Sequence, residues 1–127
     1  PPAHAGAGPV LNRLERTPDA VAEGVLHLGG AAFTCPPTWK AHTTLLIRPE
    51  DLEVGAPQAG WGAATVEQRT FLGDRVQLKL RAEGQPLLVA DVGRDIAFRP
   101  GRSVGGRLDP ARLIASHAPA RPPFSFN

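Results

Sequence analysis

The residues of this chain that could do chemistry are few, and their spacing fits no catalytic or metal-binding pattern. The histidines stand far apart, as His4, His27, His42 and His117, whereas metal sites usually place two ligands within a few residues of each other. Cys35 could form a thiol–histidine pair with His27 or His42, but no third group is evident to orient the imidazole. We therefore expect neither a metal site nor a catalytic residue.

The sequence also gives little support for a nucleophilic serine or a nucleotide-binding site. Ser103, Ser116 and Ser125 lack the strand–turn–helix context of a nucleophile elbow. The phosphate-binding pattern Gly-x-x-x-x-Gly-Lys-Ser/Thr does not occur, and Lys40 and Lys79 follow no glycine-rich loop. We therefore expect no cofactor in this chain and no ATP hydrolysis by it.

Two pairs of carboxylates, Glu50/Asp51 and Asp91/Asp95, remain as candidates for acid–base work. Carboxylates in turns are more often solvated or paired with arginine, and we interpret both pairs in that way. The first pair follows Arg48 and Pro49, so a cation and two carboxylates stand together where the predicted strand ends.

A row of cations lies on one face of the predicted strand Arg75–Ala82. Here apolar residues alternate with Arg75, Gln77, Lys79 and Arg81, which predicts one buried face and one wet, cationic face. Such a face could contact phosphates, but readers of single-stranded nucleic acid add aromatic residues for base stacking, and this face has none. We therefore expect a solvated face and no nucleic-acid partner.

Composition limits the class of protein. The 127 residues make one domain, or two very small ones that share a core. Apolar and charged fractions of 42% and 20% are ordinary for a globular protein, and the net charge of +2 is small. A single cysteine favours a reducing compartment, and no run approaches the ~18 apolar residues of a membrane span.

Short apolar segments between turn residues predict about eight to ten strands and little helix. The clearest are Thr43–Arg48, Trp61–Leu72, Arg75–Ala82, Pro86–Ala90 and Ser103–Leu108, followed by a capped turn and a last strand within Asp109–Ile114. Closing such a sheet removes its exposed edges. We therefore predict an all-β fold, a small antiparallel barrel of the oligonucleotide/oligosaccharide-binding (OB) type or two fused half-barrels.

The segment Val10–Leu28 allows two interpretations. Thr17-Pro18-Asp19 resembles a helix start, with Thr17 as N-cap and Pro18 at the first helical position. The alternative is a strand that ends near Thr17, a turn, and a second strand over Ala20–Leu28. Gly29-Gly30 stands between two extended runs, which is a hairpin signal, and on this ground we favour strands.

Segments rich in proline and glycine also predict the limits of the domain. Residues 1–9, rich in Pro, Gly and Ala, are predicted to be the remnant of a linker, and residues 118–127 a Pro-rich tail. The barrel domain is predicted over 10–117, with halves at 10–54 and 61–117. The chain opens in mid-linker without Met, so we expect it to be a piece of a longer protein.

Three motifs occur in order along the chain. They are Leu46–Leu52 (Leu-Ile-Arg-Pro-Glu-Asp-Leu), Val66-Glu67 with Leu72-Gly73-Asp74, and Arg99-Pro100-Gly101 with Leu108–Leu113 (Leu-Asp-Pro-Ala-Arg-Leu). Together they resemble the C-terminal regulatory, TOBE-type domain of the ATP-binding subunits of ABC importers for maltose-type sugars, sulfate, ferric iron and spermidine/putrescine. The family's glycine before Ile-Arg-Pro-Glu is Leu46 here, and its glutamate after Asp-Pro is Ala111.

The resemblance implies a non-catalytic regulatory and dimerisation domain of a solute importer. The alternatives are a small-anion or solute-binding module of the same barrel type and, less favoured, a nucleic-acid-binding OB fold. The implied partners are its own nucleotide-binding domain, a second copy of the ATPase subunit, and the membrane permease subunits. ATP and Mg²⁺ would bind the nucleotide-binding domain, and the implied location is cytoplasmic, at the inner face of the cell membrane.

The same resemblance gives candidate motif or interface residues. They are Arg48, Pro49, Glu50, Asp51, Gly73, Asp74, Asp109 and Arg112. Because proline has a fixed φ and no backbone N–H, the strand before Pro49 must end at Arg48. We expect Arg48 to pair with a nearby carboxylate or carbonyl, and Pro49 to fix a turn between the two halves.

Overall fold

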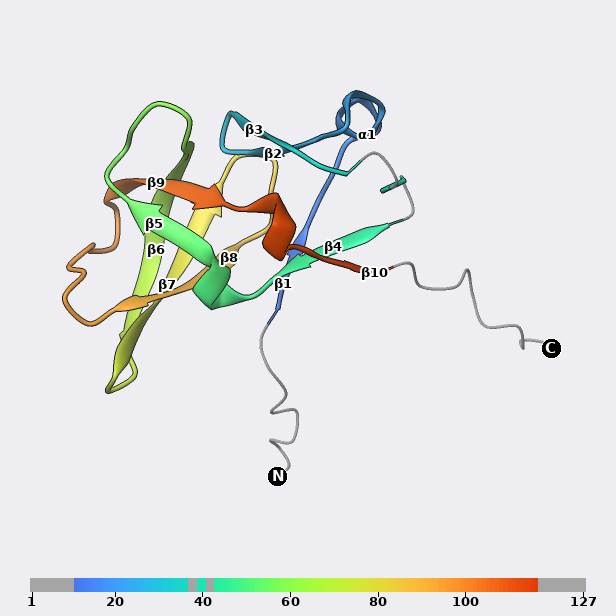
Figure 1. Ribbon diagram of the computed structural model, residues 1–127. Coiled ribbons are helices and arrows are strands. Elements are labelled where there is room, and N and C mark those ends of the chain that lie inside the picture. Colours follow the sequence, from blue (N-terminus) through green and yellow to red (C-terminus); the bar gives the residue numbers. More distant parts are fainter. Residues whose placement is uncertain (1–10, 37–38, 41–42, 117–127) are drawn as a thin grey trace.

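The computed structural model describes residues 11–36, 39–40 and 43–116, and in these residues it is built almost entirely of antiparallel strands (Figure 1). In chain order the elements are β1 (Asn12–Leu14), α1 (Pro18–Glu23), β2 (Val25–Leu28), β3 (Ala31–Thr34), β4 (Thr44–Ile47), the 3₁₀ turn η1 (Pro49–Asp51), β5 (Leu52–Gly55), β6 (Gly62–Phe71), β7 (Arg75–Ala82), β8 (Leu88–Gly93), β9 (Ser103–Leu108), the 3₁₀ turn η2 (Pro110–Arg112) and β10 (Ile114–Ser116). The predicted all-β class is confirmed. No helix in the described residues is long and apolar enough to cross a membrane.

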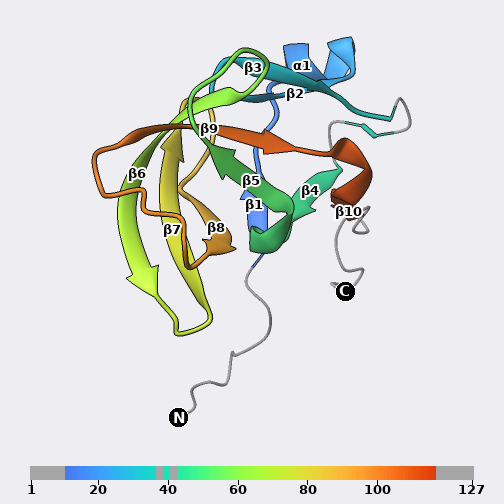
Figure 2. The ribbon, with the colours of Figure 1, turned by 60° about the vertical axis from the view of Figure 1, so that its left-hand side comes forward.

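The largest sheet has the strand order β5-β9-β6-β7-β8, and every neighbouring pair is antiparallel. Its first and last strands, β5 and β8, pack beside each other, so the sheet curls into a nearly closed, OB-like barrel (Figure 2). The inside is filled by fully buried apolar side chains, among them Val66, Leu78, Leu80 and Val104. Burial of this kind is the main stabilising term in such a fold.

A bulge in β6 changes which residues face the core. Val66 stands opposite Leu80, but the register shifts between Val66 and Gln68, and Arg69 then stands opposite Leu78. Leu78 and Leu80 are both fully buried, and residues directly opposite each other share a face of the sheet. Arg69 therefore lies on the core side of the sheet, although it is exposed where the β6–β7 hairpin projects from the barrel (Figure 1).

A three-stranded sheet, β1-β4-β10, joins segments from both ends of the chain. Asn12 of β1 is buried, and its side-chain amide donates to Val89 O and accepts from Val89 N–H of β8, both at 2.7 Å. The Asn12 side chain thus satisfies both backbone hydrogen-bonding groups of Val89, in the last strand of the barrel sheet. This contact fixes the small sheet to the barrel.

The hairpin predicted at Gly29-Gly30 is confirmed, with Leu26 opposite Phe33 in β2 and β3. The preference for strands over the preceding segment was wrong, because Pro18–Glu23 forms α1. The alternative prediction of a helix start at Thr17 and Pro18 was correct. Thr17 Oγ1 accepts from Ala20 N–H at 3.1 Å, and proline stands at the first helical position. Gly24 ends it in a left-handed conformation, with φ 73°.

The β2–β3 turn packs tightly on the barrel. Ala63 N–H donates to Gly29 O at 2.8 Å. A Cβ atom added at Gly29 would overlap the backbone of Ala63, and one added at Gly62 would overlap the backbone of Leu28. Both glycines are therefore required by close backbone approach.

Candidate functional site

The first family motif forms the corner between the small sheet and the barrel. Strand β4 ends before Arg48, Pro49 is buried at the first position of η1, and β5 begins directly afterwards. Arg48 Nη1 lies 3.8 Å from Asp51 Oδ2, so the predicted pairing of Arg48 with a carboxylate is confirmed. Asp51 is largely buried, with 13% of its side chain exposed, whereas Arg48 is half exposed.

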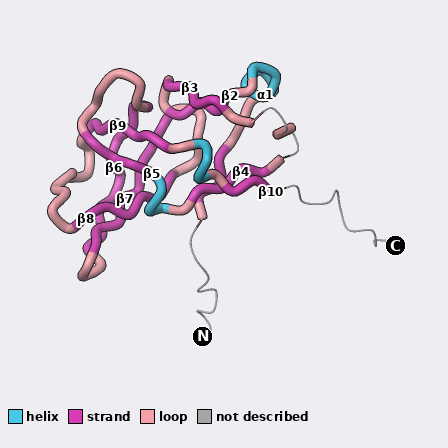
Figure 3. The backbone as a smooth tube through the Cα atoms, viewed as in Figure 1, coloured by secondary structure: helices cyan, strands magenta, loops and turns pink. Residues whose placement is uncertain are grey.

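The last family motif meets the first at this point. Asp109 Oδ1 accepts from Ala111 N–H at 3.0 Å and so caps η2. Arg112, at the end of that turn, places Nη1 at 3.6 Å from Asp51 Oδ1. Figure 3 shows the two helical turns close together. One carboxylate thus forms ion pairs with two arginines, one from the first family motif and one from the last.

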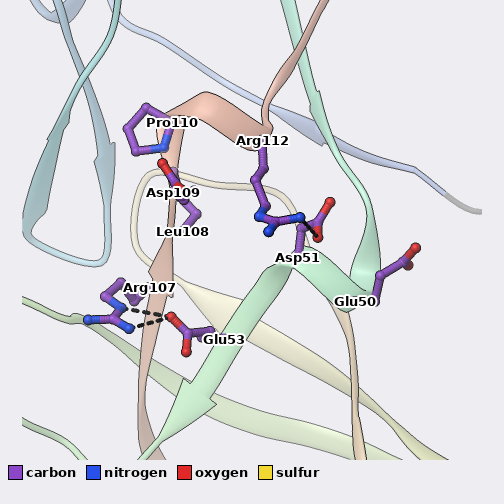
Figure 4. Close-up of a pocket in the computed structure, with 8 residues that line it drawn as sticks. All are labelled: Glu50, Asp51, Glu53, Arg107, Leu108, Asp109, Pro110 and Arg112. Atoms are coloured by element: carbon purple, nitrogen blue, oxygen red, sulfur yellow. Dashed lines mark hydrogen bonds and ion pairs between the residues drawn. The ribbon is translucent and has the colours of Figure 1, made fainter.

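We call Arg48, Glu50, Asp51, Asp109 and Arg112 the charged corner. A cavity of about 700 Å³ opens on it, lined by Glu50, Asp51, Glu53, Arg107, Leu108, Asp109, Pro110 and Arg112 (Figure 4). A second cavity of about 500 Å³ adjoins it and shares Asp51, Asp109 and Arg112.

The arginines of the larger cavity are neutralised. Arg107 binds Glu53, with nitrogen–oxygen distances of 2.8 and 2.6 Å, and it also lies 4.7 Å from the centre of the Trp61 ring. Arg112 pairs with Asp51. Glu50 and Asp109 have no ion-pair partner among the described residues, so the cavity carries an excess of negative charge. It is therefore suited to cationic groups and unsuited to oxyanions.

The remaining two candidates, Gly73 and Asp74, lie elsewhere. They form the turn of the β6–β7 hairpin, which projects away from the charged corner (Figure 1). Gly73 has a φ of 93°, and Asp74 pairs with its neighbour Arg75 at 3.3 Å. The structure thus brings six of the eight sequence candidates together and separates the hairpin turn from them.

Ser103 lies in a Gly-x-Ser-x-Gly sequence, the pattern of a nucleophile elbow, but its structural context is the one expected for an ordinary strand residue. Gly101–Gly105 reads Gly-Arg-Ser-Val-Gly and so matches Gly-x-Ser-x-Gly. A nucleophile elbow needs a helix after the serine, but Ser103 opens β9 and stands opposite Thr65 in an antiparallel pair. His27, the single histidine in the described part of the chain, lies beside Glu23 at 3.9 Å instead. This serine has no base to activate it among the described residues.

The other chemical candidates are also structural. Burial raises the pKa of the Cys35 thiol, and the nearby Arg16 charge opposes that rise. The thiol is therefore protonated and unreactive at neutral pH. Within the described residues no group of three or more His, Cys, Asp and Glu could hold a metal ion.

The cationic row on β7 is partly neutralised. Arg75 Nε lies 3.3 Å from Asp91 Oδ2, and Arg81 Nη2 lies 2.8 Å from Glu67 Oε2. Only Lys79 in that row lacks an ion-pair partner among the described residues. The row is a set of surface ion pairs, which agrees with the expectation of a solvated face.

A second concentration of charge was missed. Arg69, Arg94, Arg99 and Arg102 lie on the second half of β6 and on the loop 94–102 beside it, together with Phe71 and Phe98; we call these residues the arginine end. Three of the four arginines fall within nine residues of the sequence, and that spacing was the available signal. Arg69 joins them only because of the bulge in β6.

Comparison with known proteins places the fold in a family. No curated protein matches the sequence. Among solved structures the fold is similar to that of the cytoplasmic molybdate-binding protein ModG in a molybdate-bound crystal form, with a TM-score of 0.51 and 12% identity over 57% of this chain. The match spans 60% of the ModG chain, and at this identity it supports the fold alone. Residues 45–115, more than half of the chain, match the TOBE domain, a non-catalytic binding module. The chain therefore belongs to the TOBE domain family.

Proposed function

We propose that this chain is the C-terminal regulatory and dimerisation domain of the ATP-binding subunit of an ABC solute importer. The observation that carries the proposal is the Asp51 carboxylate, which forms ion pairs with Arg48 from the first family motif and with Arg112 from the last. The first and the last of the three resembling motifs are thereby in contact in the fold, whereas the second lies on the projecting hairpin. The domain would carry no catalytic group, and ATP and Mg²⁺ would bind its nucleotide-binding domain.

The geometry suggests how such a domain would act. The charged corner is held by two proline-opened turns, and Glu50 and Asp109 present carboxylates without ion-pair partners in the described chain. Such a surface complements arginine or lysine groups on a facing subunit. In this account the corner contacts the nucleotide-binding domain or the second ATPase subunit, and the permease is reached through the full-length protein at the cytoplasmic face of the membrane.

The proposal is tested on the full-length subunit that contains this chain. Replacing Asp51 with Asn should weaken subunit association, or change its dependence on transport conditions, while ATP turnover per folded subunit persists. Asp74→Asn is the matched control, because Asp74 belongs to a family motif but lies on the projecting hairpin. Sedimentation and phosphate release would measure the two effects. Equal behaviour of both variants, or loss of ATP turnover in folded Asp51→Asn protein, would contradict the proposal.

A second candidate function is binding of a small oxyanion. It is favoured by the likeness of the fold to a molybdate-binding protein. The charged corner is the wrong place for such a ligand, because its cavity carries excess carboxylates. Calorimetry of the purified chain with molybdate, sulfate and phosphate tests this function, and absence of heat with all three would count against it.

A further inference from the structure

The arginine end contains a hollow that the importer role does not use. It has a volume of about 410 Å³ and is lined by Arg69, Ala97, Arg99 and Pro100. This size falls within the range of about 300–1,000 Å³ that is usual for small-molecule sites. Arg69 reaches the hollow from the core-side face of β6, where the bulge places this residue.

Backbone hydrogen bonds hold the two walls of this hollow together. Gly101 N–H donates to Val66 O at 2.7 Å, and Val66 N–H donates to Arg102 O at 3.0 Å. Arg102 N–H in turn donates to Arg99 O at 3.0 Å and closes the turn that carries Arg99. The arginines on either side therefore stand on a fixed frame rather than on two independent loops.

The charge of the arginine end is not compensated within the described chain. Arg69, Arg94, Arg99 and Arg102 form no ion pair with a described residue, whereas the three arginines around the charged corner all do. Arg94 lies 6.0 Å from the centre of the Phe71 ring, and Arg102 lies 5.2 Å from that of Phe98. Asp95, in the same loop, forms no ion pair with any of them. Four arginines against this one carboxylate leave the arginine end with a net positive charge.

We propose that this hollow binds a small solute with two or more anionic oxygen groups, an oligophosphate or a polycarboxylate. Each guanidinium can grip one phosphate or carboxylate group with two parallel N–H donors, and two such forks face one hollow. The hollow is also much larger than a single tetrahedral oxyanion, which favours a longer ligand. The proposal deepens the second candidate function, on which it rests for the class of ligand, and it is independent of the importer role.

Calorimetry on the purified chain in low salt tests the proposal with tripolyphosphate, citrate and molybdate as probes. The site variant is Arg69→Ala with Arg99→Ala. The matched control is Arg13→Ala with Lys79→Ala, which removes the same charge from β1 and β7, where neither residue has an ion pair among the described residues. We expect the site variant to lose about tenfold or more in affinity, and the control about twofold or less. The tighter of tripolyphosphate and citrate identifies the ligand class.

Amide chemical shifts locate the site independently. On titration with the tighter probe, the largest changes should fall on residue 69 and residues 97–101, and Arg69→Lys with Arg99→Lys should bind more weakly than the native chain although its charge is unchanged. Equal losses in the site variant and the control would overturn the proposal, because binding would then follow diffuse charge. Oxyanion binding that survives in the site variant would overturn this site and leave the second candidate function intact. No binding of any probe by the native chain would overturn both and leave the importer role untouched.

Discussion

The charged corner and the arginine end contain the same cation in opposite circumstances. At the charged corner, Arg48 and Arg112 share Asp51, and the Glu50 and Asp109 carboxylates have no ion-pair partner in the described chain. In the cavity beside it, Arg107 pairs with Glu53. At the arginine end, four arginines stand without a carboxylate partner in the described chain. A net charge of +2 therefore conceals two regions of opposite local sign. The same side chain is therefore part of stabilising ion pairs in one region and available for a ligand in the other, according to the carboxylates around it.

The largest expected effect comes from neither region but from the contact between the small sheet and the barrel. Asn12→Ala removes both hydrogen bonds to Val89 and leaves its backbone groups unpaired beside the core. We expect the free energy of unfolding to fall by about 2 kcal/mol or more. Urea unfolding measures it, with the exposed neighbour Arg13→Ala as a control that changes little. A loss below that of the control would show that the small sheet is fixed to the barrel by other contacts.

A smaller effect tests the fastening role of the corner. Asp51→Asn removes the carboxylate that two arginines share, and we expect the free energy of unfolding to fall by about 1 kcal/mol. The loss should shrink in 1 M salt, because screening already weakens these pairs in the native protein. Glu50→Gln, which removes a neighbouring exposed carboxylate, should be neutral. Equal losses for the two variants would show that the carboxylate shared by Arg48 and Arg112 does not stabilise the corner.

Two arginine substitutions compare the regions directly. Arg107→Ala loses the Glu53 pair and the contact with Trp61, which should lower the free energy of unfolding by about 0.5–1 kcal/mol. Arg99→Ala breaks no ion pair with a described residue and should change it by less than about 0.5 kcal/mol. Parallel thermal melts measure both. A larger loss for Arg99→Ala would mean that the arginine end is structural.

The smallest expected effect concerns the Cys35 thiol, which belongs to neither region. The nearby Arg16 Nη1 and Nη2 atoms are buried without a hydrogen-bond partner among the described residues. Burial raises the pKa of the Cys35 thiol above its ordinary value of 9.0, so the folded chain holds this proton more tightly than the unfolded chain. The resulting stability is present below pH 9.0 and is lost as pH rises through the folded pKa.

The Cys35→Ala variant tests the predicted loss of stability of the native chain at high pH. The stability difference between the native chain and this variant should move against the native chain above pH 9.0, and native Cys35 should react slowly with Ellman's reagent at neutral pH. Rapid reaction of the folded protein at pH 7 would contradict the burial argument.

Much of the fold could be predicted from the sequence because its strands carry their own signals. The alternation in Arg75–Ala82 and the Gly29-Gly30 turn gave correct elements. Residues 18–23 were wrongly predicted as strand, because the Gly29-Gly30 hairpin signal favoured extended structure over the helix start at Thr17. A helix of six residues depends on its caps and on the burial of Ala20 rather than on a long periodic pattern.

The site was predicted only in part, for a physical reason. Proline turns at Pro49 and Pro110 are local features, so the corner's residues could be named from sequence. The arginine end depends on a bulge that reverses which residues of β6 face the core, and alternation alone cannot place such an irregularity. Pairing across long distances, as between Asp51 and Arg112, likewise exists only once the chain is folded.

The coding sequence immediately upstream of Pro1 is the sharpest test of the proposed importer role. If this TOBE domain belongs to an importer ATPase, an ATP-binding cassette should be encoded there, in the same reading frame, with a Gly-x-x-x-x-Gly-Lys-Ser/Thr phosphate loop. The intact protein should show the corresponding mass and bind ATP through that upstream part. A start codon directly before Pro1, or an upstream domain of another kind, would contradict the assignment of this TOBE domain to an importer ATPase.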